Sequence, residues 1–323
     1  AAKGDRDRAR LVIGNKDLWH TRREIPMEVA GSDGLFDYYE CVYQVEDPRI
    51  AYYFILDKGD EEWFYGDNGL VQPGTTNIEE DEAAAFVNFQ FPFVNSIDVH
   101  KAPSWVNSAV FYQIFPERFC NGKPELSPEG AVPWGSKPDR VNFMGGDLPG
   151  ITEKLPYLEE LGVNALYLTP IFEAQSNHKS DTIDYTRIDP HFGDESTLVE
   201  LVQQAHRRGI RIMLDGVFNH CGWRFWAFEA VLRNQERSRF RDWFYSLRFP
   251  VERPEDPDAY PTYAAYAYER MMPKLNTSNP ELREYLCNVG RYWVEEFDAD
   301  GWRLDVASEV DDGFWRAFRT AVK

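Results

Sequence analysis

The chain has 323 residues, with 10 Trp, 17 Tyr and 22 Phe, and a formal net charge of −19. This length allows two domains and a sizeable core, and so much aromatic surface must be buried or used for binding, which argues against disorder. The charge argues against nucleic acid or an anionic membrane as a partner but leaves a neutral substrate open.

Cysteine usage and the ends of the chain bear on the compartment. The four cysteines lie far apart without metal-ligand spacing, so we expect a reducing compartment, the cytoplasm, rather than a disulfide framework. No apolar run approaches the length of a membrane span. The first ten residues are charged and do not form a signal peptide, but the missing initiator Met leaves open secretion after removal of one.

Residues 1–103 are predicted to form an all-β domain. Strand-like runs at 38–45 and 50–56 are bounded by turn residues such as Asp33-Gly34 and 58–60. Several short strands at this spacing predict a small β-sandwich. Its aromatic side chains fit core packing or a sugar-binding platform.

From residue 104 onward, strands alternate with helices. Strands are predicted at 109–115, 163–170, 210–215 and 301–307, and amphipathic helices at 151–161, 195–208 and 279–297. This alternation predicts a parallel sheet, either doubly wound or a (β/α)₈ barrel. No Gly-rich phosphate loop follows a strand, which counts against a dinucleotide-binding fold. Residues 221–278 interrupt the pattern and are predicted to be an inserted subdomain.

The fourth strand carries alternating side chains. Arg303 and Asp305 should point the same way, with Cα atoms about 7 Å apart. A guanidinium beside a carboxylate keeps the carboxylate ionised, as a nucleophile or general base requires. The pair alone fits equally well a structural ion pair at a strand end.

Polar residues also follow the other strands. Asp215, Asn219 and His220 lie within six residues at the end of the third strand, where a barrel keeps its chemistry. A lone histidine is more often a core residue, but this cluster favours a functional role. The connection after the second strand, 177–185, is a polar loop whose function stays open.

Four motifs resemble one enzyme family. Residues 215–220, Asp-Gly-Val-Phe-Asn-His, resemble the first conserved region of the α-amylase family, and 301–305 resemble the second. Residues 272–276, Met-Pro-Lys-Leu-Asn, and residues 111–118 are similar to the group of cyclomaltodextrinases, neopullulanases and maltogenic amylases. The resemblance spans residues 105–323. The β-sandwich would then be the group's starch-binding-like domain, which often assists formation of a homodimer.

The resemblance implies a fold and an activity. Residues 104–323 would be the first half of a (β/α)₈ TIM barrel with a subdomain inserted after strand 3, in an α/β protein with an N-terminal β-sandwich. The activity would be retaining hydrolysis of α-1,4-glucosidic bonds in cyclodextrins, maltooligosaccharides or pullulan, without a required cofactor. The implied site consists of the nucleophile Asp305, its partner Arg303, and the substrate-binding or supporting residues His220, His178, Asp215, Asn219 and Tyr185.

The sequence departs from the family at the acid. A retaining site needs a second carboxyl group about 5 to 5.5 Å from the nucleophile, which in the family is a Glu on the fifth strand. The chain ends at Lys323, so we expect an N-terminal half that is inactive alone, and Glu309 is not assigned as the acid. Ser180 stands where the family usually has a stacking Tyr. The alternatives are a non-catalytic α-glucan-binding protein and a transglycosylase.

A calcium site found in many relatives is only partly matched. Asn121, Gly145 and Asp147 fit, but Lys123 stands where an Asp ligand is expected, and Ser127 where another is usual. An ammonium cannot ligate calcium. We therefore expect no metal, with the ammonium of Lys123 neutralising Asp147.

Overall fold

The computed structural model describes residues 3–45, 47–71, 88–91, 101–253, 255–256 and 259–323. The chain divides into two compact units, Ala1–Pro103 and Ser104–Lys323.

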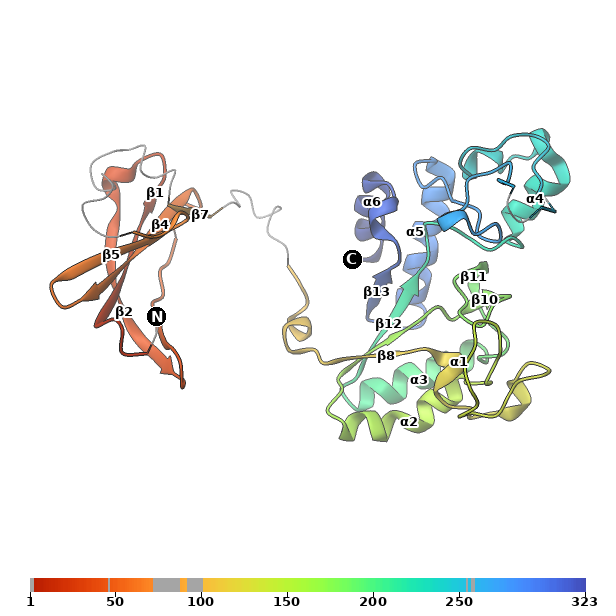
Figure 1. The fold of residues 1–323 in the computed structure, drawn as a ribbon, viewed down its shortest axis with the longest axis horizontal. Helices are drawn as coiled ribbons and strands as arrows, with labels where there is room; N and C mark the ends of the chain where they lie inside the picture. Colours follow the sequence, from red (N-terminus) through yellow and green to blue (C-terminus); the bar gives the residue numbers. More distant parts are fainter. Residues whose placement is uncertain (1–2, 46, 72–87, 92–100, 254, 257–258) are drawn as a thin grey trace. The chain divides into compact units, whose positions relative to one another are not determined.

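The described strands of the first unit form one antiparallel sheet in the order β3-β2-β1-β4-β5-β6, with β7 beside β4 (Figure 1). They are β1 (Arg8–Asn15), β2 (Arg23–Ser32), β3 (Asp37–Glu40), β4 (Ile50–Lys58), β5 (Glu61–Gly66), β6 (Gly69–Val71) and β7 (Phe89–Gln90), and the 3₁₀ turn η1 (Trp19–Thr21) follows β1. The strand predicted at 50–56 is confirmed, whereas the one predicted at 38–45 ends at Glu40.

Alternation along β4 builds the core of this unit. Every second residue of the strand is buried. The cluster consists of Val12, Trp19, Ala51, Tyr53, Ile55 and Phe64. Core packing is therefore the role of these three aromatic residues.

The second unit contains a four-stranded parallel sheet. It consists of β8 (Phe111–Ile114), β9 (Ala165–Leu168), β12 (Arg211–Gly216) and β13 (Gly301–Leu304), in the order β13-β12-β9-β8. Each strand lies beside the next one along the chain, as in a barrel wall, whereas a doubly wound sheet reverses its order. The sheet is part of a barrel, and all four strands were predicted.

Helices connect these strands, and one more helix follows the last strand. They are α1 (Pro116–Phe119), α2 (Leu148–Glu160), α3 (Glu195–Arg207), α5 (Pro280–Glu295) and α6 (Asp312–Val322), with 3₁₀ turns η3 (Ser104–Ser108), η4 (Pro124–Leu126) and η8 (Ala307–Glu309). The side chain of Asn279 accepts hydrogen bonds at the start of α5, which confirms the predicted N-cap. Helices α2 and α3 pack together, as do α5 and α6 (Figure 1).

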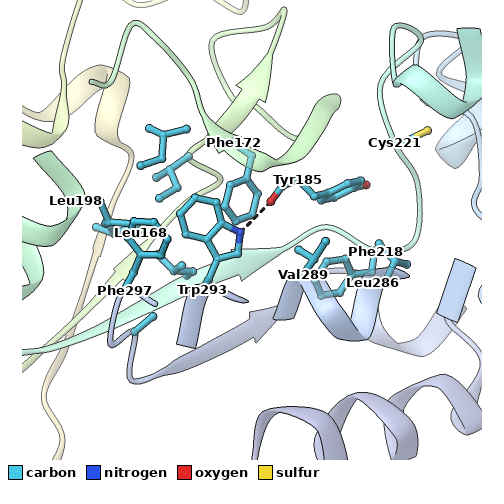
Figure 2. Packing of buried hydrophobic residues seen from close by; sticks show 14 of the residues in the cluster. Leu168, Phe172, Tyr185, Leu198, Phe218, Cys221, Leu286, Val289, Trp293 and Phe297 are labelled. Atoms are coloured by element: carbon cyan, nitrogen blue, oxygen red, sulfur yellow. Dashed lines mark hydrogen bonds between the residues drawn. The ribbon is translucent and has the colours of Figure 1, made fainter. Parts of the chain in front are cut away.

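Trp293 on α5 occupies the centre of the core (Figure 2). Its indole N–H donates to the carbonyl of Tyr185 at 2.8 Å, and its ring centroid lies 5.0 Å from that of Phe172. The apolar faces predicted for α3 and α5 are buried as expected: Leu198, Leu201, Val202, Ala205, Leu282, Leu286, Val289 and Trp293.

Two segments extend beyond the strand ends. The first is the antiparallel hairpin of β10 (Phe172–Ala174) and β11 (Thr182–Ile188), so the predicted polar loop becomes a strand at Thr182. The second is the insertion between β12 and α5, which contains α4 (Trp226–Asn234), η5 (Gln235–Arg237), η6 (Arg241–Trp243) and η7 (Tyr266–Tyr268). A bridge between His220 and Lys274 joins the insertion to the end of β12.

Candidate active site

Arg303 binds two carboxylates at the ends of neighbouring strands. The parallel register places Asp215 of β12 opposite Arg303 of β13. Arg303 Nη1 lies 2.5 Å from Asp305 Oδ1, and 3.3 and 3.2 Å from the two oxygens of Asp215. The side chain of Asp305 is 22% exposed, whereas that of Asp215 is 3% exposed. A ligand can therefore reach Asp305, while Asp215 binds the guanidinium from the buried side.

Tyr167 on β9 completes this cluster and was not singled out in the sequence. Its hydroxyl donates to Asp215 Oδ2, and its ring lies 5.6 Å from the guanidinium carbon of Arg303. Burial raises the pKa of Asp215 to about 6, although the hydroxyl of Tyr167 and the charge of Arg303 act in the opposite direction. The only sequence signal for Tyr167 is its place near the end of a predicted strand.

The backbone turns sharply after the nucleophile candidate. Strand β13 ends at Leu304, so the prediction of a strand through Ala307 was wrong. Val306 has φ of 47°, a left-handed conformation that is rare for a β-branched residue. The N–H of Asp305 still donates to the carbonyl of Gly216 at 3.1 Å. This turn ends the strand alternation directly after Asp305.

Lys274 of the insertion orients His220 through Asn219. Lys274 Nζ donates to Asn219 Oδ1 at 2.6 Å and to Glu309 Oε2 at 3.0 Å. Because Oδ1 faces the ammonium, Nδ2 of Asn219 is directed at His220 Nδ1, 3.3 Å away, and makes that ring nitrogen an acceptor. The proton of the neutral ring is then on Nε2, a buried atom without a hydrogen-bond partner among the described residues. Such a donor is suited to a ligand oxygen.

His220 is neutral near pH 7. Burial lowers its pKa to about 4, against the opposing charge of Asp305. The ring of Tyr266 stacks on the imidazole with centroids 4.4 Å apart and planes at 5°. Tyr266 was not predicted, and the sequence marks it only as one of many aromatic residues in the insertion.

His178 lines a cavity beside the insertion. The cavity measures about 900 Å³, and Asp181, Tyr266 and Arg140 also line it. The N–H of Ser180 donates to His178 Nδ1 at 3.2 Å, which leaves the proton of the neutral ring on Nε2. Burial also lowers the pKa of His178. Both predicted histidines are thus held as neutral Nε2–H donors.

The structure contradicts a substrate-binding role for Tyr185. Its side chain is fully buried in the core around Trp293. Its hydroxyl lies 2.8 Å from the carbonyl oxygen of Val217 and 2.9 Å from that of His220. Because the ring packs under this segment, Tyr185 supports the residues around His220 and cannot contact a sugar.

The expected role of the Lys123 ammonium is also wrong. Asp147 is buried, and its carboxylate accepts from the backbone N–H groups of Gly122 at 3.0 Å, Lys123 at 2.8 Å and Gly150 at 2.6 Å. The side chain of Lys123 is exposed and forms no ion pair with Asp147. Three backbone donors therefore compensate the buried charge.

The other calcium candidates do not complete a cation site. Asn121 Nδ2 donates to Ser127 Oγ at 2.8 Å, and Asn121 Oδ1 is buried without a partner among the described residues. At Gly145 a Cβ would meet Ser127 Oγ, so the space there is filled. Calcium takes six to eight oxygen ligands, but the carboxylate of Asp147 is directed at N–H groups, and Glu117 Oε1 accepts from the N–H of Gly145 at 3.0 Å. The residues present do not fit the ion, and among the described residues no group of three His, Cys, Asp or Glu could hold one.

Comparisons with known proteins identify the domains of the chain. The alpha amylase catalytic domain matches residues 113–318, and the alpha amylase N-terminal ig-like domain matches residues 1–95. In the described residues, no helix is both long and apolar enough to cross a bilayer.

Several relatives match nearly the whole chain. A cyclomaltodextrinase of Geobacillus thermopakistaniensis (strain MAS1) is 48% identical over 99% of this chain and 54% of its own length. Neopullulanase 2 of Thermoactinomyces vulgaris is 48% identical over 91% of this chain and 48% of its own length. The chain thus spans about half the length of these relatives.

Solved structures give the same result. A cyclomaltodextrinase structure aligns with a TM-score of 0.74 at 45% identity, covering 100% of this chain and 54% of that one. A cyclic α-maltosyl-(1→6)-maltose hydrolase from Arthrobacter globiformis aligns with a TM-score of 0.66 at 48% identity, covering 69% of this chain and 50% of that one. With the matched domains, the sheet order and the identities taken together, the chain belongs to the α-amylase family of glycoside hydrolases.

Proposed function

We propose that this chain supplies the nucleophile and part of the sugar-binding site for retaining hydrolysis of α-1,4-glucosidic bonds. The observation that carries the proposal is the partly exposed Asp305 carboxylate, 2.5 Å from Arg303 Nη1 at the end of β13. His220, whose pKa is lowered by burial against the opposing charge of Asp305, presents a buried Nε2–H without a partner among the described residues. A sugar oxygen is the ligand atom suited to that donor.

The chemistry proceeds in two displacements. An oxygen of Asp305 attacks the anomeric carbon, the glycosidic bond breaks, and its electron pair leaves with the oxygen of the departing sugar. This step gives a covalent glycosyl-enzyme, which water then hydrolyses. Arg303 holds the carboxylate in place, and His220 and His178 donate hydrogen bonds from Nε2 to sugar oxygens.

The departing oxygen needs a proton, and neither nearby carboxyl group is assigned to give it. Glu309 is engaged by the ammonium of Lys274 at 3.0 Å, and Asp215 is buried between Arg303 and Tyr167. We therefore expect this chain alone to be inactive on cyclodextrins, maltooligosaccharides and pullulan. The names of the relatives, cyclomaltodextrinase and neopullulanase, support these substrates.

An activated substrate tests the nucleophile without the acid. In α-maltosyl fluoride the C–F bond breaks with its electron pair on fluoride, which does not need full protonation to leave. The chain should release fluoride and gain the mass of one maltosyl unit, and the Asp305→Asn variant should do neither. Equal fluoride release by both proteins, or none by either, would refute the assignment of Asp305.

The same experiment addresses the alternatives. A non-catalytic α-glucan-binding protein, which Ser180 favours, would bind maltooligosaccharides without releasing fluoride. A transglycosylase would release fluoride and pass the maltosyl group to an added acceptor sugar in preference to water. Product analysis at high acceptor concentration separates this outcome from hydrolysis.

The remaining expectations concern the first unit and the location. Its starch-binding role, a homodimer formed through it and a cytoplasmic location stay predictions. A similar protein from Bacillus subtilis (strain 168) is named intracellular maltogenic amylase, which supports the last of these.

A further inference from the structure

An exposed tryptophan lines a second cavity that continues from His178. Trp134 is 70% exposed and borders a cavity of about 570 Å³, which His178 and Arg140 also line. His178 and Arg140 also line the 900 Å³ cavity beside Tyr266, so the two cavities lie side by side, and we refer to them together as the groove. Trp134 lines one part of the groove, Tyr266 lines the other, and His178 lines both; the ring of Tyr266 stacks on His220.

The indole is held in a fixed orientation. Its Nε1–H donates to the carbonyl of Arg118 at 3.0 Å, so one edge is tethered while most of the ring stays open to solvent. The open face of the tethered ring is a flat apolar surface on which a ligand can stack.

The loop around Trp134 is anchored by polar side chains. Arg118 donates to the side chain of Asn142 at 2.7 Å and to its carbonyl at 2.8 Å. Asn177, which is 5% exposed, donates to the same carbonyl at 2.8 Å and to that of Arg140 at 3.2 Å. Asn177 directly precedes His178, so the loop and the histidine are tied to one another.

We propose that Trp134 forms a distal sugar-binding subsite, on which an α-glucan chain stacks when its other end lies at Asp305. The apolar C–H face of a pyranose ring complements the open indole face. The other lining groups include both acids and bases, among them Asp139 and Arg140, and such a mixture suits the hydroxyls of a neutral sugar better than an ion. This inference rests on the proposed function.

Binding of sugars of different length to the full chain tests the subsite. By calorimetry, the Trp134→Ala variant should bind maltoheptaose roughly three- to tenfold more weakly than the original chain, with maltose binding unchanged. Trp134→Phe, which retains a ring, should recover most of the affinity. Tyr157→Ala, which removes an exposed aromatic side chain on α2 outside both cavities, is the matched control and should bind both sugars normally.

Each other outcome overturns the inference. If Trp134→Ala binds maltoheptaose normally, the groove carries no distal subsite. If it loses maltose and maltoheptaose equally, Trp134 acts on the fold or the central site. If it changes only the mass in solution, the exposed ring is an interface between copies of the chain. If the original chain binds neither sugar, the inference and the proposed function fail together. If fluoride release depends on Asp305 but the Trp134→Ala variant binds maltoheptaose normally, only the inference fails.

Discussion

Replacing Lys274 by Met should destabilise the protein chiefly through Asn219. The ammonium donates to Asn219 Oδ1 at 2.6 Å, and Asn219 is 1% exposed, so the substitution leaves a buried acceptor unpaired. An unpaired buried acceptor costs about 1–3 kcal/mol. The ion pair with Glu309, whose side chain is 51% exposed, adds no more than about 1 kcal/mol. The free energy of unfolding should therefore fall by roughly 1–4 kcal/mol.

Urea unfolding of the full chain measures this loss, and Glu309→Gln is the matched control because it removes only the exposed contact. A second readout is the pKa of His220 from NMR titration. The charge of Lys274 is one cause of the lowered pKa of His220, so this pKa should rise in Lys274→Met. If Lys274→Met is no less stable than Glu309→Gln and leaves the pKa of His220 unchanged, Lys274 does not orient Asn219 and His220.

Two further substitutions test the buried groups. The pKa of His220 is lowered to about 4, so the contribution of His220 to stability is present above pH 6.5 and is lost as the pH falls towards 4. The pKa of Asp215 is raised to about 6, so the contribution of Asp215 is present below pH 3.8 and is lost as the pH rises through 6. The two contributions oppose each other between pH 4 and 6. In urea unfolding, the Asp215→Asn variant should therefore lose stability on acidification more steeply than the original chain, by up to about 1.36 kcal/mol per pH unit. Equal slopes for the two proteins would contradict these pKa shifts. Tyr185→Phe should lower the free energy of unfolding by about 1–3 kcal/mol because the buried carbonyls of Val217 and His220 lose a donor. In the control Tyr292→Phe, which removes an exposed hydroxyl, the free energy of unfolding should change by no more than about 0.5 kcal/mol. Similar losses in both variants would exclude a specific role for the Tyr185 hydroxyl.

Local patterns predicted most of the second unit. The cap residue Asn279 and the apolar spacing of α3 and α5 depend on neighbours within a few residues, so they were visible in the sequence. The end of β13 was not, because the alternation of side chains in the sequence continues past Leu304, whereas the backbone turns at Val306 with φ of 47°. The strand that begins at Thr182 was also missed. Its polar residues hide the alternation typical of a strand, and it pairs with the short strand β10.

The candidate site was predicted where strand ends converge and missed where distant segments meet. Arg303, Asp305 and Asp215 come together because parallel neighbours place their carboxyl ends at one edge. Lys274 reaches Asn219 across 55 positions, a link that no local pattern contains. The error at Lys123 has another cause, because side-chain charge was considered while the donors to Asp147 are backbone N–H groups.

The charges of the cluster suit the reaction that we propose. At pH 7 one guanidinium, Arg303, faces two carboxylates, Asp305 and Asp215, and the two histidines are neutral because burial lowers their pKa. The cluster therefore carries a net negative charge where positive charge develops on the sugar ring, and a protonated histidine would oppose it. Because the pKa of Asp215 is about 6, acidification neutralises that residue before it charges His220, whose pKa is about 4. Acidification thus changes the charge of Asp215, a residue too buried to touch the sugar itself, before it changes that of His220.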